Sequence, residues 1–169
     1  MAVTYKLIET ITVGSGGTSA IDFTSIPATY TDLKLVFSIR TSRSNSAIDS
    51  IGLKTNNVLT NQSHRGLLGD GSAASSFTYT EISAIVTGNT GVASIFGNGE
   101  FYLPNYSGST NKSVSVDSVQ ENNATQARAD MGAGLWSQTT AINQLTLYSQ
   151  NFATILQYSS ASLYGIKNS

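Results

Sequence analysis

The 169-residue chain contains no cysteine and few charged residues. The absence of cysteine excludes disulfide bonds and cysteine-ligated zinc sites. Charged residues make up 11% of the chain, whereas roughly 25% is usual for soluble domains. Nine basic and ten acidic residues leave a net charge of −1. Because no basic surplus is present to attract nucleic acid or a membrane surface, we expect neither as a partner.

Long apolar runs are also missing from the sequence. No stretch approaches the 18 or more apolar residues of a membrane helix, and the N-terminal segment lacks the apolar block of a signal peptide. We therefore expect a protein that is made in the cytoplasm and is not exported by such a signal. A mass of 17.8 kDa predicts a single domain, 1–169, that is large enough to form a core without metal or disulfide support.

The sequence is rich in hydroxyl side chains and in alternating apolar residues. The chain has 25 serine and 20 threonine residues, and threonine suits the half-buried surface of a strand. Alternation is clearest over 33–39, where Leu33, Leu35, Phe37 and Ile39 share one face. A similar pattern at the N-terminus places Tyr5, Leu7, Ile11 and Val13 on one face, with Ile8 breaking it. We predict further strands over 20–23, 48–53, 77–81 with a possible continuation to 86, 92–96, 100–103, around Val114 and Val116, and over 128–136, 142–148 and 160–166.

Turn residues separate these short segments. Pro27 and Pro104 each end a segment, and residues 55–76 form a long polar, glycine-rich stretch with a turn signal at Asp70–Gly71. Only residues 121–131 offer a possible helical turn. About eight to ten short strands with turns between them predict an all-β protein, an antiparallel β-sandwich that is jelly-roll-like.

Residues suited to catalysis are scarce. His64 is the only histidine, and we interpret it as a polar loop or interface residue rather than a general base. No G-x-S-x-G, calcium-loop or phosphate-loop motif is present. Asp49 and Asp117 are expected to accept hydrogen bonds from loops or to pair with arginine. We therefore predict no catalytic, cofactor-binding or metal-binding residues, and no cofactor.

Three arginines are the candidate interface residues. Arg40 and Arg43 follow the strand over 33–39, and Arg65 lies in the polar stretch. Arginine favours interface ion pairs because its planar guanidinium meets a carboxylate at two points. The alternative is a solvated strand end. The eight tyrosines are compatible with sugar binding, but core packing or subunit contacts are the first interpretation. Trp136 is expected in the core.

Four segments resemble small virion proteins of tailed bacteriophages, especially cyanophages and other phages of aquatic bacteria. They are MAVTYKLIETITVGSGG, FTSIPATYTDLKLVFSIRTSRS, FYLPNYSGSTNKSVSVDSVQENNATQ and GLWSQTTAINQLTLYSQNFATILQYSSASLYGIKNS. The resemblance implies a structural role as a capsid cement or decoration protein. Such proteins are β-sandwich modules, often homotrimers, that bind neighbouring major capsid protein subunits on the outer surface of the head. The resemblance carries no catalytic motif.

Three hypotheses follow. The first is a decoration protein on the outer capsid surface of the virion, which stabilises the head without catalysing a reaction. The second is a tail-fibre or receptor-binding module that binds carbohydrate and exposes an aromatic patch. The third is an enzyme such as a depolymerase or lyase, which would need a cleft with paired carboxylates near His64 or an arginine–tyrosine cluster.

Overall fold

The computed structural model describes residues 4–122 and 127–167. Within these ranges the chain forms twelve β-strands and no helix, which confirms the predicted all-β class with slightly more strands than expected. The strands are β1 (Tyr5–Thr12), β2 (Ala20–Phe23), β3 (Asp32–Ile39), β4 (Ile48–Thr55), β5 (Gln62–Gly69), β6 (Ala74–Tyr79), β7 (Ser83–Thr87), β8 (Gly97–Leu103), β9 (Lys112–Glu121), β10 (Ala127–Trp136), β11 (Leu145–Ser149) and β12 (Ser160–Ile166).

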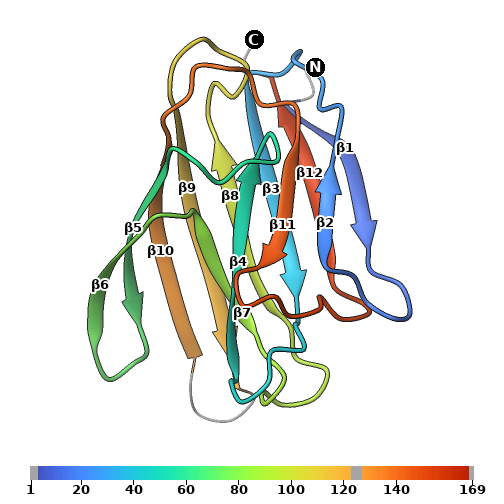
Figure 1. The fold of residues 1–169 in the computed structure, drawn as a ribbon, viewed down its shortest axis with the longest axis vertical. Helices are drawn as coiled ribbons and strands as arrows, with labels where there is room; N and C mark the ends of the chain where they lie inside the picture. Colours follow the sequence, from blue (N-terminus) through green and yellow to red (C-terminus); the bar gives the residue numbers. More distant parts are fainter. Residues whose placement is uncertain (1–3, 123–126, 168–169) are drawn as a thin grey trace.

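The strands form two antiparallel sheets that pack face to face (Figure 1). The large sheet has the order β1-β12-β3-β8-β9-β10-β5-β6, and the small sheet has the order β2-β11-β4-β7. Eight of the strands pair in nested fashion: β1 with β12, β2 with β11, β3 with β8, and β4 with β7. Such nesting is the topology of a jelly roll, in which a long hairpin folds over into two sheets.

The remaining four strands are two hairpins inserted into this jelly roll. One hairpin, β5–β6, lies between β4 and β7 in sequence, and the other, β9–β10, lies between β8 and β11. The hairpins join each other through β5 and β10 and extend the large sheet beyond β8. We call the four strands β9, β10, β5 and β6 the wing; it lies at the left of Figure 1.

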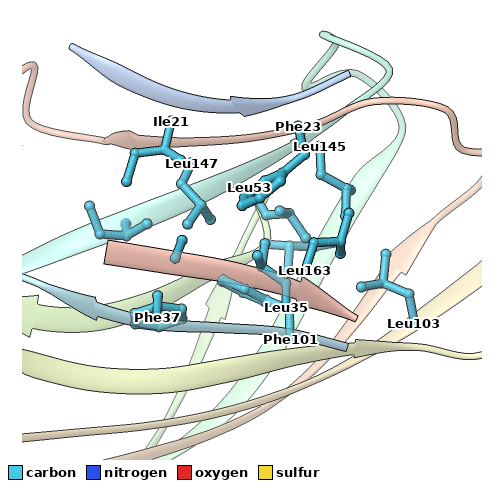
Figure 2. Packing of buried hydrophobic residues seen from close by; sticks show 14 of the residues in the cluster. Ile21, Phe23, Leu35, Phe37, Leu53, Phe101, Leu103, Leu145, Leu147 and Leu163 are labelled. Carbon is cyan, nitrogen blue, oxygen red and sulfur yellow. The ribbon is translucent and has the colours of Figure 1, made fainter. Parts of the chain in front are cut away.

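The core lies between the two sheets and consists mainly of aliphatic and aromatic side chains (Figure 2). Leu35 and Phe101 of the large sheet and Leu53 and Leu147 of the small sheet are fully buried. The alternation seen over 33–39 places every second residue of β3 in this core, as the sequence predicts. Trp136 is also buried, at 2% exposure.

The N-terminal strand departs from the predicted face. The register of β1 against β12 shifts between Leu7 and Glu9, which is the mark of a β-bulge at Ile8. The bulge exchanges the faces of the strand, so Ile8 and Ile11 pack against the core while Tyr5 and Leu7 are about half exposed. The prediction that Tyr5 and Leu7 share the buried face with Ile11 is therefore wrong.

Three other segments differ from the sequence-based prediction. The polar stretch 55–76 contains β5 and the first half of β6, and residues 92–96 form no strand because β8 begins at Gly97. The possible helical turn over 121–131 lies partly outside the described residues. Its described part belongs to β9 and β10.

Candidate functional site

The outer face of the wing carries the most prominent exposed apolar side chains of the large sheet. Side chains alternate along β5 and β10, so Leu67 and Met131 point away from the core, and each is 62% exposed. The two residues are paired across the strands. They line a groove of about 700 Å³ together with Ala133, Ser76 and other outward residues. We call this the outer groove.

Charged residues lie at both sides of the outer groove. Glu100 on β8 stands directly opposite Asp117 on β9, an arrangement of like charges that is unfavourable in a sheet. Lys34 offsets it through an ion pair with Glu100 at 2.7 Å. Arg65 lines the groove from β5, two strands away from Asp117. The groove therefore combines an apolar floor with an acidic side and a basic side.

The inner face of the wing holds His64, which is fully buried. Its Nδ1 accepts a hydrogen bond from the backbone N–H of Ser83 on β7, at 3.4 Å. Its ring meets Phe77 edge-on with centroids 5.3 Å apart, and its Nε2 lies over Gly132 with no room for a side chain there. The interpretation of His64 as a loop or interface residue is wrong, because it lies on a strand and caps the edge of β7.

Several polar atoms on this inner face have no hydrogen-bond partner. They include His64 Nε2, Asp130 Oδ1, Arg128 Nε and Trp136 Nε1, and all but His64 belong to β10. Burial raises the pKa of Asp130 to about 6, although nearby Arg128 opposes the rise. Burial alone lowers the pKa of His64. Among the described residues, the buried polar side-chain atoms that lack a hydrogen-bond partner are therefore concentrated between the wing and the small sheet.

These two faces separate the groups that an acid–base enzyme would bring together. The Glu100–Asp117 pair lies on the outer face, whereas His64 lies on the inner face beneath Arg65. The structure therefore does not place the carboxylate pair near His64. In the described ranges, no three histidine, aspartate or glutamate side chains come together in a way that could hold a metal ion.

The three candidate arginines occupy different environments. Arg40 is only 8% exposed, and its guanidinium donates hydrogen bonds to the carbonyls of Asn89, Gly91, Val92 and Ile95 at 2.5–3.1 Å. It does not point outward as expected, because the loop over 88–96 offers it carbonyls that no strand partner uses.

Arg43 and Arg65 are more accessible. Arg43 donates to the carbonyl of Ile48 at 2.9 Å and approaches Asp49 at 3.7 Å. Arg65 is exposed on β5 and donates to the neighbouring His64 carbonyl at 3.2 Å. Contact with a partner remains a prediction for all three arginines, and Arg65 alone has its side chain in a groove with exposed apolar residues.

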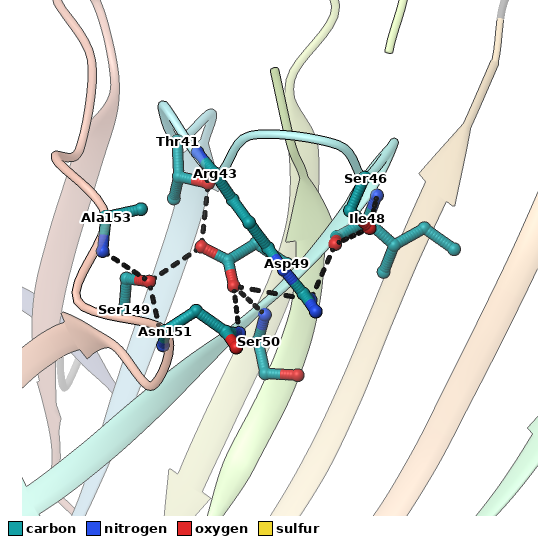
Figure 3. Close-up of polar contacts among 9 residues, drawn as sticks. All are labelled: Thr41, Arg43, Ser46, Ile48, Asp49, Ser50, Ser149, Asn151 and Ala153. Carbon is teal, nitrogen blue, oxygen red and sulfur yellow. Dashed lines mark hydrogen bonds and ion pairs between the residues drawn. The ribbon is translucent and has the colours of Figure 1, made fainter. Parts of the chain in front are cut away.

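Asp49 is the centre of a buried polar network at the end of the sandwich (Figure 3). Its Oδ2 accepts hydrogen bonds from the hydroxyls of Thr41 and Ser149, both at 2.7 Å. Its Oδ1 accepts from the Asn151 amide at 2.6 Å and from the Ser50 backbone at 2.8 Å. The expectation that Asp49 accepts hydrogen bonds from loops is confirmed, and the network joins the loops after β3 and β11.

The loop between β11 and β12 displays two aromatic rings: Phe152, which the sequence analysis did not single out, and Tyr158, one of the eight tyrosines, which does not lie in the core. Phe152 is 96% exposed and Tyr158 is 72% exposed. Both have left-handed backbones, with φ of 56° and 69°, which is unusual for bulky residues. The only sequence signal is their position among polar residues that lack strand alternation.

Comparisons with known proteins provide no relative. No protein-family model, no curated protein and no solved structure matches this chain. Among the described residues, no helix is long and apolar enough to cross a membrane.

Proposed function

We propose that this chain is a structural virion protein of a tailed bacteriophage, a decoration protein that binds the outer surface of the head and stabilises it. The resemblance of its sequence segments to small phage virion proteins supports the phage setting. The jelly-roll body with its two interleaved hairpins suits a rigid module that acts by docking. In this proposal the protein has no catalytic activity, needs no cofactor, and binds the major capsid protein.

The outer groove is the observation that carries the proposal. Leu67 and Met131 expose apolar surface to water. This exposure does not stabilise a monomer, and exposed apolar patches commonly mark interaction sites. Arg65 and Asp117 flank them with opposite charges. An apolar centre with charged surroundings is the usual composition of a protein–protein interface. We infer that a capsid subunit covers this groove.

The free edge of the wing supports assembly into a homotrimer. Strand β6 ends the large sheet, has no charged residue and no proline, and exposes most of its side chains. An edge of this kind tends to pair with or pack against another chain. A threefold ring closes by symmetry and would bury the β6 edge of every subunit.

Binding to capsids tests the proposal directly. Capsids of the parent phage assembled without this protein are mixed with the purified chain and sedimented. We expect co-sedimentation of the wild-type protein and a higher melting temperature of the capsids. The variant Leu67→Asp/Met131→Asp should lose at least about tenfold in affinity, because it places charge in the apolar centre.

Leu7→Asp is the matched control for this variant. Leu7 is a leucine on the outer face of the same sheet, 50% exposed, at the opposite edge. This variant should bind as the wild type does. Failure of the wild-type protein to bind capsids, or equal losses in both variants, would contradict the proposal.

A second candidate function is a tail-fibre or receptor-binding module. The exposed ring of Phe152 favours it, because that function requires exposed aromatic surface. Electron microscopy of virions separates the two candidates. Density for this chain at threefold positions of the head supports decoration, whereas density at the tail tip supports receptor binding.

A further inference from the structure

A second hollow, of about 380 Å³, lies on the outer face of the small sheet. Its lining includes Lys54 of β4, Tyr148 of β11, Glu81, Gln150 and Phe152. Its volume is at the lower end of the roughly 300–1,000 Å³ in which proteins hold small ligands. The hollow is far from the outer groove, because the two open on opposite sheets.

Polar groups are fixed on one side of this hollow. The Tyr148 ring lies flat against Gly52, where a side chain would collide with it. The Tyr148 hydroxyl donates to Glu81 Oε2 at 2.6 Å, and the Gln150 amide donates to the same oxygen at 2.9 Å. Burial and the Glu81 carboxylate raise the pKa of Tyr148, so the hydroxyl keeps its proton.

These contacts leave hydrogen-bonding capacity facing the hollow. Both bonds to Glu81 use Oε2, so its second oxygen remains an acceptor. Lys54 Nζ lies 4.9 Å from the centre of the Tyr148 ring, where it keeps N–H groups for a ligand. Gln150 keeps its carbonyl oxygen as an acceptor. The hollow thus offers donors and acceptors side by side.

Phe152 forms the apolar side of the hollow. Its ring is 96% exposed, so it contributes almost no burial to folding. Its left-handed backbone is strained for a residue with a bulky side chain. A strained and fully exposed phenyl ring at the rim of a polar hollow points to a role in binding rather than in stability.

The loop that carries Phe152 is held rigidly on both sides. Asn151 donates to the buried carboxylate of Asp49, and the backbone N–H of Ala153 donates to Ser149 Oγ at 3.1 Å (Figure 3). The Phe152 N–H donates to the carbonyl of Ser149 at 3.0 Å. The Asp49 network therefore holds the backbone that carries the ring before any ligand arrives, which lowers the entropic cost of binding.

We propose that this hollow binds a hexose unit of a polysaccharide, an inference that rests on the second candidate function and names its site. A pyranose ring has an apolar C–H face, which stacks on Phe152, and hydroxyl groups at its edge, which bond to Glu81, Gln150 and Lys54. A sugar hydroxyl both donates and accepts hydrogen bonds, and so matches the mixture of groups present. The inference does not depend on head docking, since it uses another sheet and other residues.

Saturation-transfer NMR with the intact protein tests the proposal. The probes are the methyl pyranosides of glucose, galactose, mannose and N-acetylglucosamine, together with the O-polysaccharide of the host. We expect transfer to the ring C–H protons of at least one probe. Phe152→Ala should weaken binding about tenfold or more, and Glu81→Gln should weaken it through the loss of a charged acceptor.

Tyr158→Ala is the matched control, because Tyr158 is an exposed ring on the same loop that does not line the hollow. This variant should bind the sugar as the wild type does. Circular dichroism and melting temperature should show that Phe152→Ala is folded. The absence of transfer to every probe, or binding that Phe152→Ala leaves unchanged, would overturn the proposal while leaving capsid docking untouched.

Discussion

The two halves of the large sheet are built differently although they share one continuous ladder. The half formed by β1, β12, β3 and β8 places residues such as Leu35 and Phe101 against the small sheet. The wing adds Val114, Val116 and Trp136 to this core, but its inner face also holds His64, Asp130 and several glycines. The first half therefore owes its stability mainly to apolar burial, whereas the wing depends also on rings that pack over glycines.

The outer edges of the two halves differ in the same way. Edge strand β1 carries Lys6, Glu9 and the bulge at Ile8, which are devices that discourage pairing with another chain. Edge strand β6 has none of these. The third edge, that of β7, is covered by the wing, since Ser118 Oγ and His64 Nδ1 accept hydrogen bonds from its backbone. The fourth edge, that of β2, is only four residues long and carries Asp22. Among the described strands, β6 is therefore the edge that has neither a charged residue nor cover from the wing.

The largest expected effect on stability comes from comparing a buried leucine of the first half with an exposed leucine of the wing. Leu35→Ala removes a fully buried side chain and should lower the free energy of unfolding by about 3 kcal/mol. Leu67→Ala in the wing removes an exposed side chain and should change it by less than about 0.5 kcal/mol. Urea denaturation of the two variants measures both values. Equal losses would show that the outer face of the wing around Leu67 is buried in solution, contrary to its exposure in the structure.

Asp130→Asn should stabilise the wing at neutral and alkaline pH. The pKa of Asp130 is about 6 in the folded protein, above its ordinary value of 3.8. The folded state therefore loses stability as pH rises from about 4 through 6, by up to about 3 kcal/mol. Urea denaturation should show a stability gain for the variant at pH 8 that vanishes near pH 3. Asp117→Asn, on the exposed face opposite, is the control and should gain less than about 1 kcal/mol.

Gly132→Ala tests the packing of rings over glycines. A methyl group at Gly132 would lie 2.0 Å from His64 Nε2, and the buried ring has no space to move away. We expect a loss of about 2 kcal/mol in the free energy of unfolding. Gly69→Ala on neighbouring β5 is the matched control, because nothing lies within 4 Å of the added carbon. A Gly132→Ala variant as stable as Gly69→Ala would refute this account of the wing.

Acid should weaken the contact between the wing and β7 through His64. Burial lowers the pKa of His64 below 6.5, so its contribution is complete above pH 6.5. It falls at lower pH, where the unfolded chain binds a proton that the folded chain resists. Asp130 acts in the opposite direction between about pH 4 and 6. The effect is therefore best measured in the Asp130→Asn background, with and without His64→Gln, by urea midpoints at pH 7.5 and 5.

The smallest effect on stability is expected at the β6 edge. Ser75→Lys places a charge on this exposed strand and should change the free energy of unfolding by less than about 0.5 kcal/mol, because Ser75 pairs with Leu68 and does not line the outer groove. It should nevertheless shift the protein towards monomer in analytical ultracentrifugation, if β6 is the edge used in assembly. Leu7→Lys on β1 is the control and should leave association unchanged. Identical association of the two variants would mean that the edges do not differ.

Sequence patterns predict the jelly-roll half well because its strands alternate regularly. The alternation from Leu33 to Ile39 corresponds to β3 with no shift of the buried face. The N-terminal strand shows the limit, since the irregularity at Ile8 is visible but its outcome is a bulge that moves Tyr5 and Leu7 into solvent. A bulge depends on the partner strand, and therefore on contacts more than 150 residues away in the chain, between Leu7 and Tyr164.

The wing and the candidate sites could not be predicted in the same way. Strand β5 cannot be recognised from its polar, glycine-rich sequence. Gly66 belongs in the strand because the Phe77 ring packs over it, and only the folded sheet shows this contact. An apolar residue such as Met131 would be assigned to the core from sequence, yet it is 62% exposed because no described segment covers it on the outer face. Arg40 turns inward because the loop over 88–96 folds around it.

The pairing of the two inserted hairpins, through β5 and β10, determines when the wing can fold. Hairpin β5–β6 is held in the sheet by β10 alone, yet β6 ends at Tyr79 and β10 begins only at Ala127. During synthesis the ribosome therefore releases this hairpin well before the strand that will hold it. The wing closes late, after a non-local pairing that is slow to form, and a nascent chain that stops short of β10 leaves the hairpin without a place to dock.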